Sequence, residues 1–232
     1  MTMPVRRNIA LNLDLEHILR RQEIGPRARL KPELLAVLQD LFASVHELDL
    51  LKPAFVYEFH QVDELQRARS LLQEDREMAS FTIPPVLSEA IELAVVVCTI
   101  GPRLDERVAY YSRNREPLRA LMLDGIGSAA VDLVAQEACN LISQEAQSRG
   151  YQASSPVSPG MPGLPIAAQR LLFRIVPADQ INVSLTNSCM MVPFKSVSMV
   201  IGLGPTMPAW TQEEVCARCS LNKNCLHRVF HK

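Results

Sequence analysis

Cysteines near the C-terminus form the clearest chemical pattern in the sequence. Cys216, Cys219 and Cys225 have the spacing C-x2-C-x5-C, with His227 just beyond. Two thiolates three residues apart can hold one metal centre, as in zinc and iron–sulfur sites, but such a centre takes four ligands. His227, or Cys189 from the core, could complete the set. The spacing predicts a metal site, either zinc or iron–sulfur, against the alternative of a thiol-rich tail without metal.

A second candidate site lies in "SSPVSPGMPGLPIAAQRLLF", residues 154–173, where a loop rich in proline and glycine turns abruptly into a helical run. A loop this stiff is a poor linker and a plausible wall of a binding site. The turn Met190-Met191-Val192-Pro193 is also unusual, because polar residues flank it on segments that otherwise need apolar faces: Thr186, Asn187, Ser188, Ser196 and Ser198. Methionine clusters are normally core filler. Beside hydroxyl groups and a proline-rich loop, they could instead line a pocket for a large, partly apolar ligand.

The segment "DGIGSAA", residues 124–130, matches G-x-G-x-x-A and suggests a dinucleotide site. That motif works only where a strand delivers the glycines to a helix N-terminus. The preceding "EPLRALML" has helical spacing, so the sequence favours a tight helix–helix junction in which Ser128 and Ala130 permit close packing.

These candidate sites need elements to position them. Helices are expected over 12–22, 32–50 and from 102 to 150, with breaks near Pro117 and Asp124. A half-buried strand is expected in "AFVYEFHQV", a buried strand before Gly101-Pro102, and two strands joined through the Met-Pro turn within 181–205. Separate strands and clustered helices favour an α+β fold. We expect an N-terminal segment at 1–82 that packs on a core at 83–206, and a cysteine-rich tail at 207–232.

Composition narrows the class of protein. A net charge of −1 over 232 residues gives no basic footprint for nucleic acid. The longest apolar run, "IELAVVVCTIG", is too short to span a bilayer, and the N-terminus lacks the pattern of a secretory signal. Six cysteines fit thiols or metal ligands better than disulfides. A cytoplasmic protein is expected.

Two separated patterns resemble the reactivation domain of cobalamin-dependent methionine synthase. The loop pattern of that family, Ala/Ser-Pro-Gly-aromatic and then a helix, corresponds to Ser158-Pro159-Gly160, Leu164-Pro165 and 169–173. Its second pattern, Leu-Thr-Glu-Ser, Met-x-Pro and Ser-Val-Ser, corresponds to 185–188, 191–193 and 196–198. A long helix opening at 127–130 stands where the family has its helix before the loop. The resemblance covers about residues 90 to 204.

The resemblance implies a curved, mostly antiparallel sheet with helices packed against it. It also implies a subunit that binds S-adenosylmethionine and acts in trans on a corrinoid protein or cobalamin-dependent methyltransferase, whose cobalamin it helps to return to the active state. The positions that would bind the cofactor are Ser158, Pro159, Gly160, Met161, Arg170, Thr186, Asn187, Ser188, Met191, Pro193 and Ser196.

The sequence also departs from the family pattern. The family's arginine before the loop has no counterpart, Met161 replaces the aromatic residue, and Asn187 replaces the strand glutamate. Arg170 could substitute for the missing arginine as a partner for a carboxylate. The alternative function is a metal-bearing, iron–sulfur electron-transfer or docking module for corrinoid proteins that does not use S-adenosylmethionine. A scaffold that keeps the fold without the ligand is a third possibility.

Overall fold

A computed structural model describes residues 5–21, 31–62, 85–161 and 163–208, together with Glu214 and Ala217. Its strands are β1 (Val5–Arg7), β2 (Ala54–Gln61), β3 (Glu92–Thr99), β4 (Gln152–Ala153), β5 (Ser184–Leu185), β6 (Met191–Val192) and β7 (Ser196–Gly204). Its α-helices are α1 (Leu15–Arg21), α2 (Pro32–Glu47), α5 (Arg103–Arg113), α6 (Pro117–Ser148) and α7 (Gln169–Ile175). Short 3-10 turns η2 (Pro85–Leu87), η3 (Ile166–Ala168) and η4 (Ala178–Ile181) complete the described elements.

Five strands form one curled antiparallel sheet in the order β1-β2-β3-β7-β4. The central strand β3 pairs along its whole length with β2, from Ala54↔Thr99 to Gln61↔Glu92, and with β7 on its other side. The expected fold class, a curved antiparallel sheet with helices packed against it, is therefore confirmed. The buried strand before Gly101 is confirmed, and the strand expected at 54–62 is observed as β2. Its half-buried character is not, because the first four residues of β2 are all buried, where both cores cover the strand.

Side chains of β3 alternate between two hydrophobic cores. Ala94, Val96 and Cys98 lie in a core that α1, α2, α5 and α6 cover. Leu93, Val95 and Val97 lie in a second core, on the opposite face, that includes α7 and the loop before it. All eight residues of β3 are buried. A strand covered on both faces reads as a continuous apolar run, which is why "LAVVVC" shows no alternation in the sequence.

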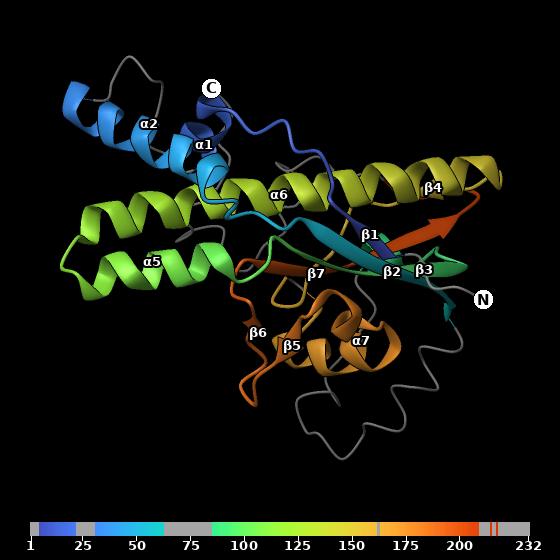
Figure 1. Ribbon diagram of the computed structural model, residues 1–232. Helices are drawn as coiled ribbons and strands as arrows, with labels where there is room; N and C mark the ends of the chain where they lie inside the picture. Colours follow the sequence, from blue (N-terminus) through green and yellow to red (C-terminus); the bar gives the residue numbers. More distant parts are fainter. Residues whose placement is uncertain are drawn as a thin grey trace.

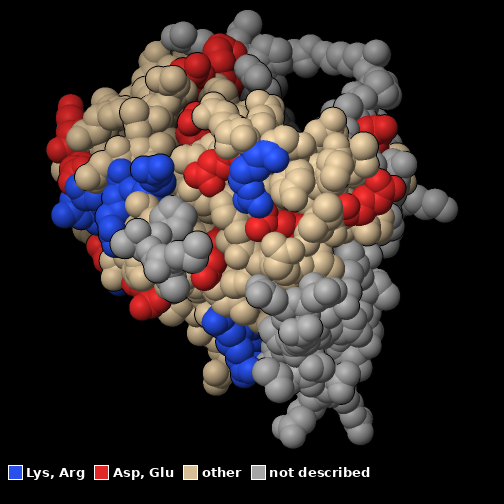
Figure 2. Space-filling model, turned by 90° about the vertical axis from the view of Figure 1, so that its right-hand side faces the viewer, with Lys and Arg blue, Asp and Glu red and all other residues tan. Residues whose placement is uncertain are grey.

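The molecule has three layers (Figure 1). Helix α6 lies along one face of the sheet, with α5 beside it, while α7 and the β5–β6 hairpin lie on the other face. On the side shown in Figure 2, acidic and basic side chains are interspersed rather than gathered into one basic patch. Among the described residues, no helix combines the length and apolar character that crossing a membrane requires.

Two predictions about the helical region were wrong. Helix α6 continues without a break from Pro117 to Ser148, so the chain does not interrupt at Asp124 and the long helix does not open at Gly127. The segment 124–130 is therefore no junction between helices, and its glycines lie buried inside one helix. A β-carbon on Gly127 would lie 2.6 Å from Leu104 Cδ2. Gly127 thus allows α5 to pack closely against α6, and no strand-to-helix turn for a dinucleotide exists there.

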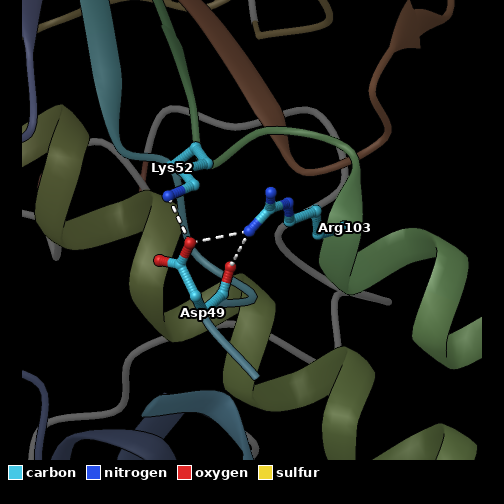
Figure 3. Close-up of polar contacts among 3 residues, drawn as sticks. All are labelled: Asp49, Lys52 and Arg103. Atoms are coloured by element: carbon cyan, nitrogen blue, oxygen red, sulfur yellow. Dashed lines mark hydrogen bonds and ion pairs between the residues drawn. The ribbon is translucent and has the colours of Figure 1, made fainter. Parts of the chain in front are cut away.

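An ion-pair cluster fastens the end of α2 to the start of α5 (Figure 3). Arg103 Nη1 donates to the Asp49 carbonyl at 3.1 Å and to Asp49 Oδ2 at 2.6 Å, and Lys52 also contacts this carboxylate. The hydrogen bond from Lys52 lowers the pKa of Asp49. Asp49 has a φ of 50°, so the chain leaves α2 through a left-handed residue before entering β2. The cluster is exposed, and such pairs contribute little free energy to folding.

The expected division at 1–82, 83–206 and 207–232 stays a prediction. Residues of α1 and α2 share one core with β3 and α6, while 63–84 and most of the tail lie outside the described residues.

Candidate functional site

Strand pairing brings the two family-like patterns side by side. Gln152 and Ala153 pair with the end of β7, and the pairing continues through the bond from Ser154 N to the Gly202 carbonyl at 2.8 Å. Val157 and Val200 then exchange backbone hydrogen bonds of 2.9 and 2.8 Å. Because the chains run antiparallel, residues after Val157 continue toward the Ser196–Ser198 end of β7. The proline-rich loop therefore begins next to the Ser-Val-Ser segment.

The loop closes on itself through its backbone. Met161 N donates to the Ser158 carbonyl at 3.0 Å, and Gly160 N donates to the Leu164 carbonyl at 2.7 Å. Gly160 has a φ of 97°, a conformation that glycine adopts without steric cost. The Met161 side chain is partly buried and packs against the second core, with its sulfur 3.2 Å from Ser158 N. Met161 therefore supports the turn from within.

The β5–β6 hairpin forms the second part of the site. Its turn is closed by Thr186 N donating to the Met190 carbonyl at 2.9 Å and by Thr186 Oγ1 accepting from Met190 N at 3.0 Å. The hydroxyls of Thr186 and Ser188 lie 3.0 Å apart. Cys189 has a φ of 63° and is only 4% exposed. Beyond it, every second side chain is apolar and exposed: Met190, Val192 and Phe194.

Arg170 joins the helix after the loop to this hairpin. Its Nη2 donates to the Asn187 carbonyl at 3.1 Å. The loop, α7 and the hairpin also share the second core, against which Met161 and Met191 both pack. The structure thus places the Ser158–Met161 loop, Arg170 and the Thr186–Met191 hairpin on the same face of the sheet, where Arg170 contacts the hairpin directly.

Pro193 and Ser196 lie where the hairpin leads into β7. The Val192–Pro193 peptide bond is cis, and Pro193 is buried. Ser196 is also buried and donates to Thr99 Oγ1 at 3.0 Å, while Thr99 Oγ1 accepts from Gly101 N at 3.0 Å. The Ser196 hydroxyl therefore joins β7 to the end of β3, so its hydrogen bond here is structural.

The predicted metal ligands cannot be assembled from the described residues. Cys216, Cys219, Cys225 and His227 lie outside them. Cys189, the alternative fourth ligand, is buried within the hairpin. In the part of the chain that the structure describes, no group of three or more His, Cys, Asp or Glu side chains could hold a metal ion. The metal site stays a prediction.

Four neighbours of the candidate site were not among the predicted site residues: Asp105, Asp124, Ser128 and Lys195. Lys195 Nζ lies 2.8 Å from Asp124 Oδ1 and donates to Ser128 Oγ at 3.0 Å. Asp105 Oδ2 accepts from Phe194 N at 2.7 Å. One feature of the sequence pointed to them: Lys195 stands between the Met-Pro turn and an apolar strand, a position where a charged side chain needs a partner.

The described arrangement offers backbone groups, hydroxyls and one guanidinium, beside the exposed apolar side chains of Met190, Val192 and Phe194. Among its predicted cofactor-binding residues, Arg170 alone carries a full charge, so the set offers recognition by shape and hydrogen bonding rather than by a cluster of charges. No nucleophile–base pair is present among these residues.

Comparison with known proteins defines the class of fold. The crystal structure of the MetH reactivation domain bound to AdoHcy superposes with a TM-score of 0.58 and covers 90% of this chain and 81% of that chain. The two sequences are 14% identical. No protein-family model and no curated protein sequence matches the chain. This chain therefore has the fold of the MetH reactivation domain, as the resemblance in the two motifs predicted.

Proposed function

We propose that this chain binds S-adenosylmethionine between the Pro159-Gly160 loop and the β5–β6 hairpin, and that it helps to reactivate a partner corrinoid methyltransferase. The observation that carries the proposal is the Val157–Val200 pairing, which brings the loop beside the Ser-Val-Ser strand in a chain of this fold. The matched crystal structure contains AdoHcy, the molecule that remains when S-adenosylmethionine gives up its methyl group.

Two features of the structure fit a ligand at this place. A β-carbon built on Gly160 would meet only Ile166 Cδ1, at 3.9 Å, so a ligand could approach the loop backbone closely there. In the layer between β7 and α7, Ser198 Oγ and Gln169 Oε1 are buried without a hydrogen-bond partner among the described residues. An unmet buried polar atom costs about 1–3 kcal/mol. The layer therefore has hydrogen-bonding capacity that the described protein groups leave unused.

The residues of the site would position the ligand and exclude water. The loop backbone at Ser158–Gly160 would line one side, and the hydroxyls of Thr186 and Ser188 the other. Arg170 has five N–H donors on its guanidinium, so it could serve Asn187 and a ligand carboxylate together. Met190, Val192 and Phe194 would provide an apolar rim. When bound, S-adenosylmethionine would supply the methyl group that captures the reduced cobalt of the partner's corrinoid and so draws an unfavourable reduction forward.

Affinity should be modest for this type of site, because the family's arginine is missing. One charge-assisted contact contributes about 1.5–3 kcal/mol, so its absence corresponds to roughly ten- to a hundred-fold weaker binding. Isothermal titration calorimetry with S-adenosylmethionine, up to about millimolar ligand, tests this directly.

Gly160→Ala provides a sharp test, with Gly150→Ala as its matched control. Both glycines have positive φ values, 97° and 74°, so an alanine costs a similar backbone strain at either position. Gly150 follows α6 with nothing within 4 Å of an added β-carbon. Binding should weaken by about ten-fold or more in Gly160→Ala and stay unchanged in Gly150→Ala. Equal loss in both variants, or no heat with the unmodified chain, would contradict a ligand site at this loop.

The reactivation role has a separate test. The purified chain is added to an oxidised corrinoid methyltransferase together with a reductant and S-adenosylmethionine, and methyl transfer is measured. Recovery should depend on the chain and on S-adenosylmethionine. Equal recovery without the chain would remove the role. Recovery that needs the chain but not S-adenosylmethionine would support the alternative electron-transfer or docking module.

A further inference from the structure

The short segment Phe194–Ser196 connects the cis-proline turn to β7 and ends one wall of the proposed site. Its aromatic side chain cannot be what holds it, because Phe194 is 63% exposed. The backbone around Phe194 must therefore be fixed by other groups. Those groups come from the 99–105 region and from α6, which are distant in sequence.

Asp105, in the first turn of α5, holds one end of the segment. Its carboxylate accepts a 2.7 Å hydrogen bond from Phe194 N, across 89 residues of sequence. Burial raises the pKa of Asp105, while hydrogen bonds from the amides of Phe194 and Lys195 act in the opposite direction. The charged groups that face this carboxylate are the Lys195 ammonium, which favours its ionised form, and Asp124, which opposes it. Asp105 therefore holds the backbone of the segment at the Phe194 amide.

Lys195 holds the segment from the opposite direction. Its ammonium group bonds to Asp124 Oδ1 at 2.8 Å and Ser128 Oγ at 3.0 Å, both on α6. The side chain is only 13% exposed, and a β-carbon on Gly127 would lie 3.2 Å from its Cγ. The Lys195 carbonyl also accepts from Ile100 N at 3.2 Å. A buried lysine stem that fits over a glycine and ends on two acceptors has little freedom to move.

We propose that Asp105 and Lys195 are positioning residues, which together hold Phe194–Ser196 in one conformation and so fix the hairpin wall against which the ligand binds. The second part rests on the proposed function; the first part does not. Neither residue needs to touch the ligand. They act through the backbone of the segment that links the Met-Pro turn to β7.

Amide hydrogen exchange of the ligand-free chain tests the first part. In Asp105→Ala the Phe194 amide loses its acceptor and should exchange roughly ten-fold faster or more. In Asp105→Asn the side-chain carbonyl can still accept, so protection should largely return. Lys195→Met keeps the apolar stem but removes the ammonium, and it should also speed exchange in this segment. Glu106→Ala, an exposed carboxylate on the same helix, is the control and should change nothing here. Unchanged exchange at Phe194 in Asp105→Ala would overturn the proposal.

Calorimetry with S-adenosylmethionine tests the second part on the same proteins. Asp105→Ala and Lys195→Met should bind several-fold more weakly, whereas Asp105→Asn and Glu106→Ala should bind like the unmodified chain. Faster exchange with unchanged affinity would overturn the role in binding. If the unmodified chain shows no binding at all, the proposed function and this second part both fail, while the exchange result still decides whether Asp105 and Lys195 hold the segment.

Discussion

Burial raises the pKa of the Asp105 carboxyl above its ordinary value of 3.8, despite two amide hydrogen bonds and a nearby lysine. A carboxyl group whose pKa is raised in the folded state binds more protons there than in the unfolded chain. The raised pKa of Asp105 therefore costs no stability at a pH below its pKa in the unfolded chain. The cost grows as the pH rises from that pKa to the higher pKa of the folded state, and it is complete above the folded-state pKa.

Asp105→Asn should remove this pH-dependent cost while keeping an acceptor for Phe194 N. We expect the variant to melt at a higher temperature than the unmodified chain near neutral pH, with the difference shrinking as the pH falls toward about 4. Thermal unfolding followed by circular dichroism across this range measures the difference. A difference that does not change with pH would contradict the assignment of the raised pKa to Asp105.

The close packing around Gly127 leads to a prediction about stability. Alanine favours a helix over glycine by about 1 kcal/mol. A β-carbon at Gly127, however, would lie 2.6 Å from Leu104 Cδ2 and 3.2 Å from Lys195 Cγ. Gly127→Ala should therefore be destabilising by about 1–3 kcal/mol, because overpacking outweighs propensity. Denaturant unfolding measures this, with the exposed Asn140→Ala on the same helix as a control that should be neutral or slightly stabilising. A stabilised Gly127→Ala would mean that α5 can shift away without cost.

At the scale of elements, β3 is the strand around which the other layers are arranged. It pairs with a full-length neighbour on each side, and its side chains fill both cores. By contrast, β1 and β4 are edge strands of 3 and 2 residues. Amide exchange should be slowest in β3 and fastest in these edge strands, because opening β3 requires disruption of both cores. Mass-spectrometric exchange on peptides that cover 92–99 checks this, and faster exchange in β3 than in α6 would contradict it.

Helix α6 shows how an element can override its local sequence. Gly125 and Gly127 each lower helix propensity, yet thirteen residues of α6 are buried, among them residues on both sides of the glycines. The apolar side chains among them pack against the sheet and α5, and the free energy of this burial exceeds the cost of two glycines in a helix. The helix therefore continues past Asp124, where the sequence pattern predicted a break.

At the scale of the whole molecule, the metal site predicted in the cysteine-rich tail is to be tested in the intact chain. Since Cys189 is buried within the hairpin, we expect the tail residues to hold a metal without it. Cys216→Ser and Cys219→Ser should each abolish bound metal, and Cys189→Ser should leave it unchanged. Anaerobic purification, metal analysis and absorption spectroscopy distinguish an iron–sulfur cluster from zinc. Metal loss in Cys189→Ser would place the site beside the hairpin, and a metal-free unmodified chain would remove the metal site altogether.

Several features of this protein follow from its sequence alone. Alternation and continuous apolar runs are local patterns, so β2, β3 and the α+β class were predictable from the residues, whereas the antiparallel sheet was expected from the resemblance. The two motifs also identified the fold, although the chains are only 14% identical. Such patterns reflect which side chains face a core and which backbone positions need proline or glycine.

Only the tertiary structure decided how the candidate site is assembled. The Val157–Val200 pairing aligns the loop with β7, and the bonds from Phe194 to Asp105 and from Lys195 to Ser128 span 89 and 67 residues. The periodicity of a segment does not determine which distant segment lies beside it, because the neighbours of a segment depend on how the helical layers pack on the sheet. In the same way, the hydrogen bond from the Ser196 hydroxyl to Thr99 spans 97 residues, and the predicted role of Ser196 in ligand binding stays a prediction.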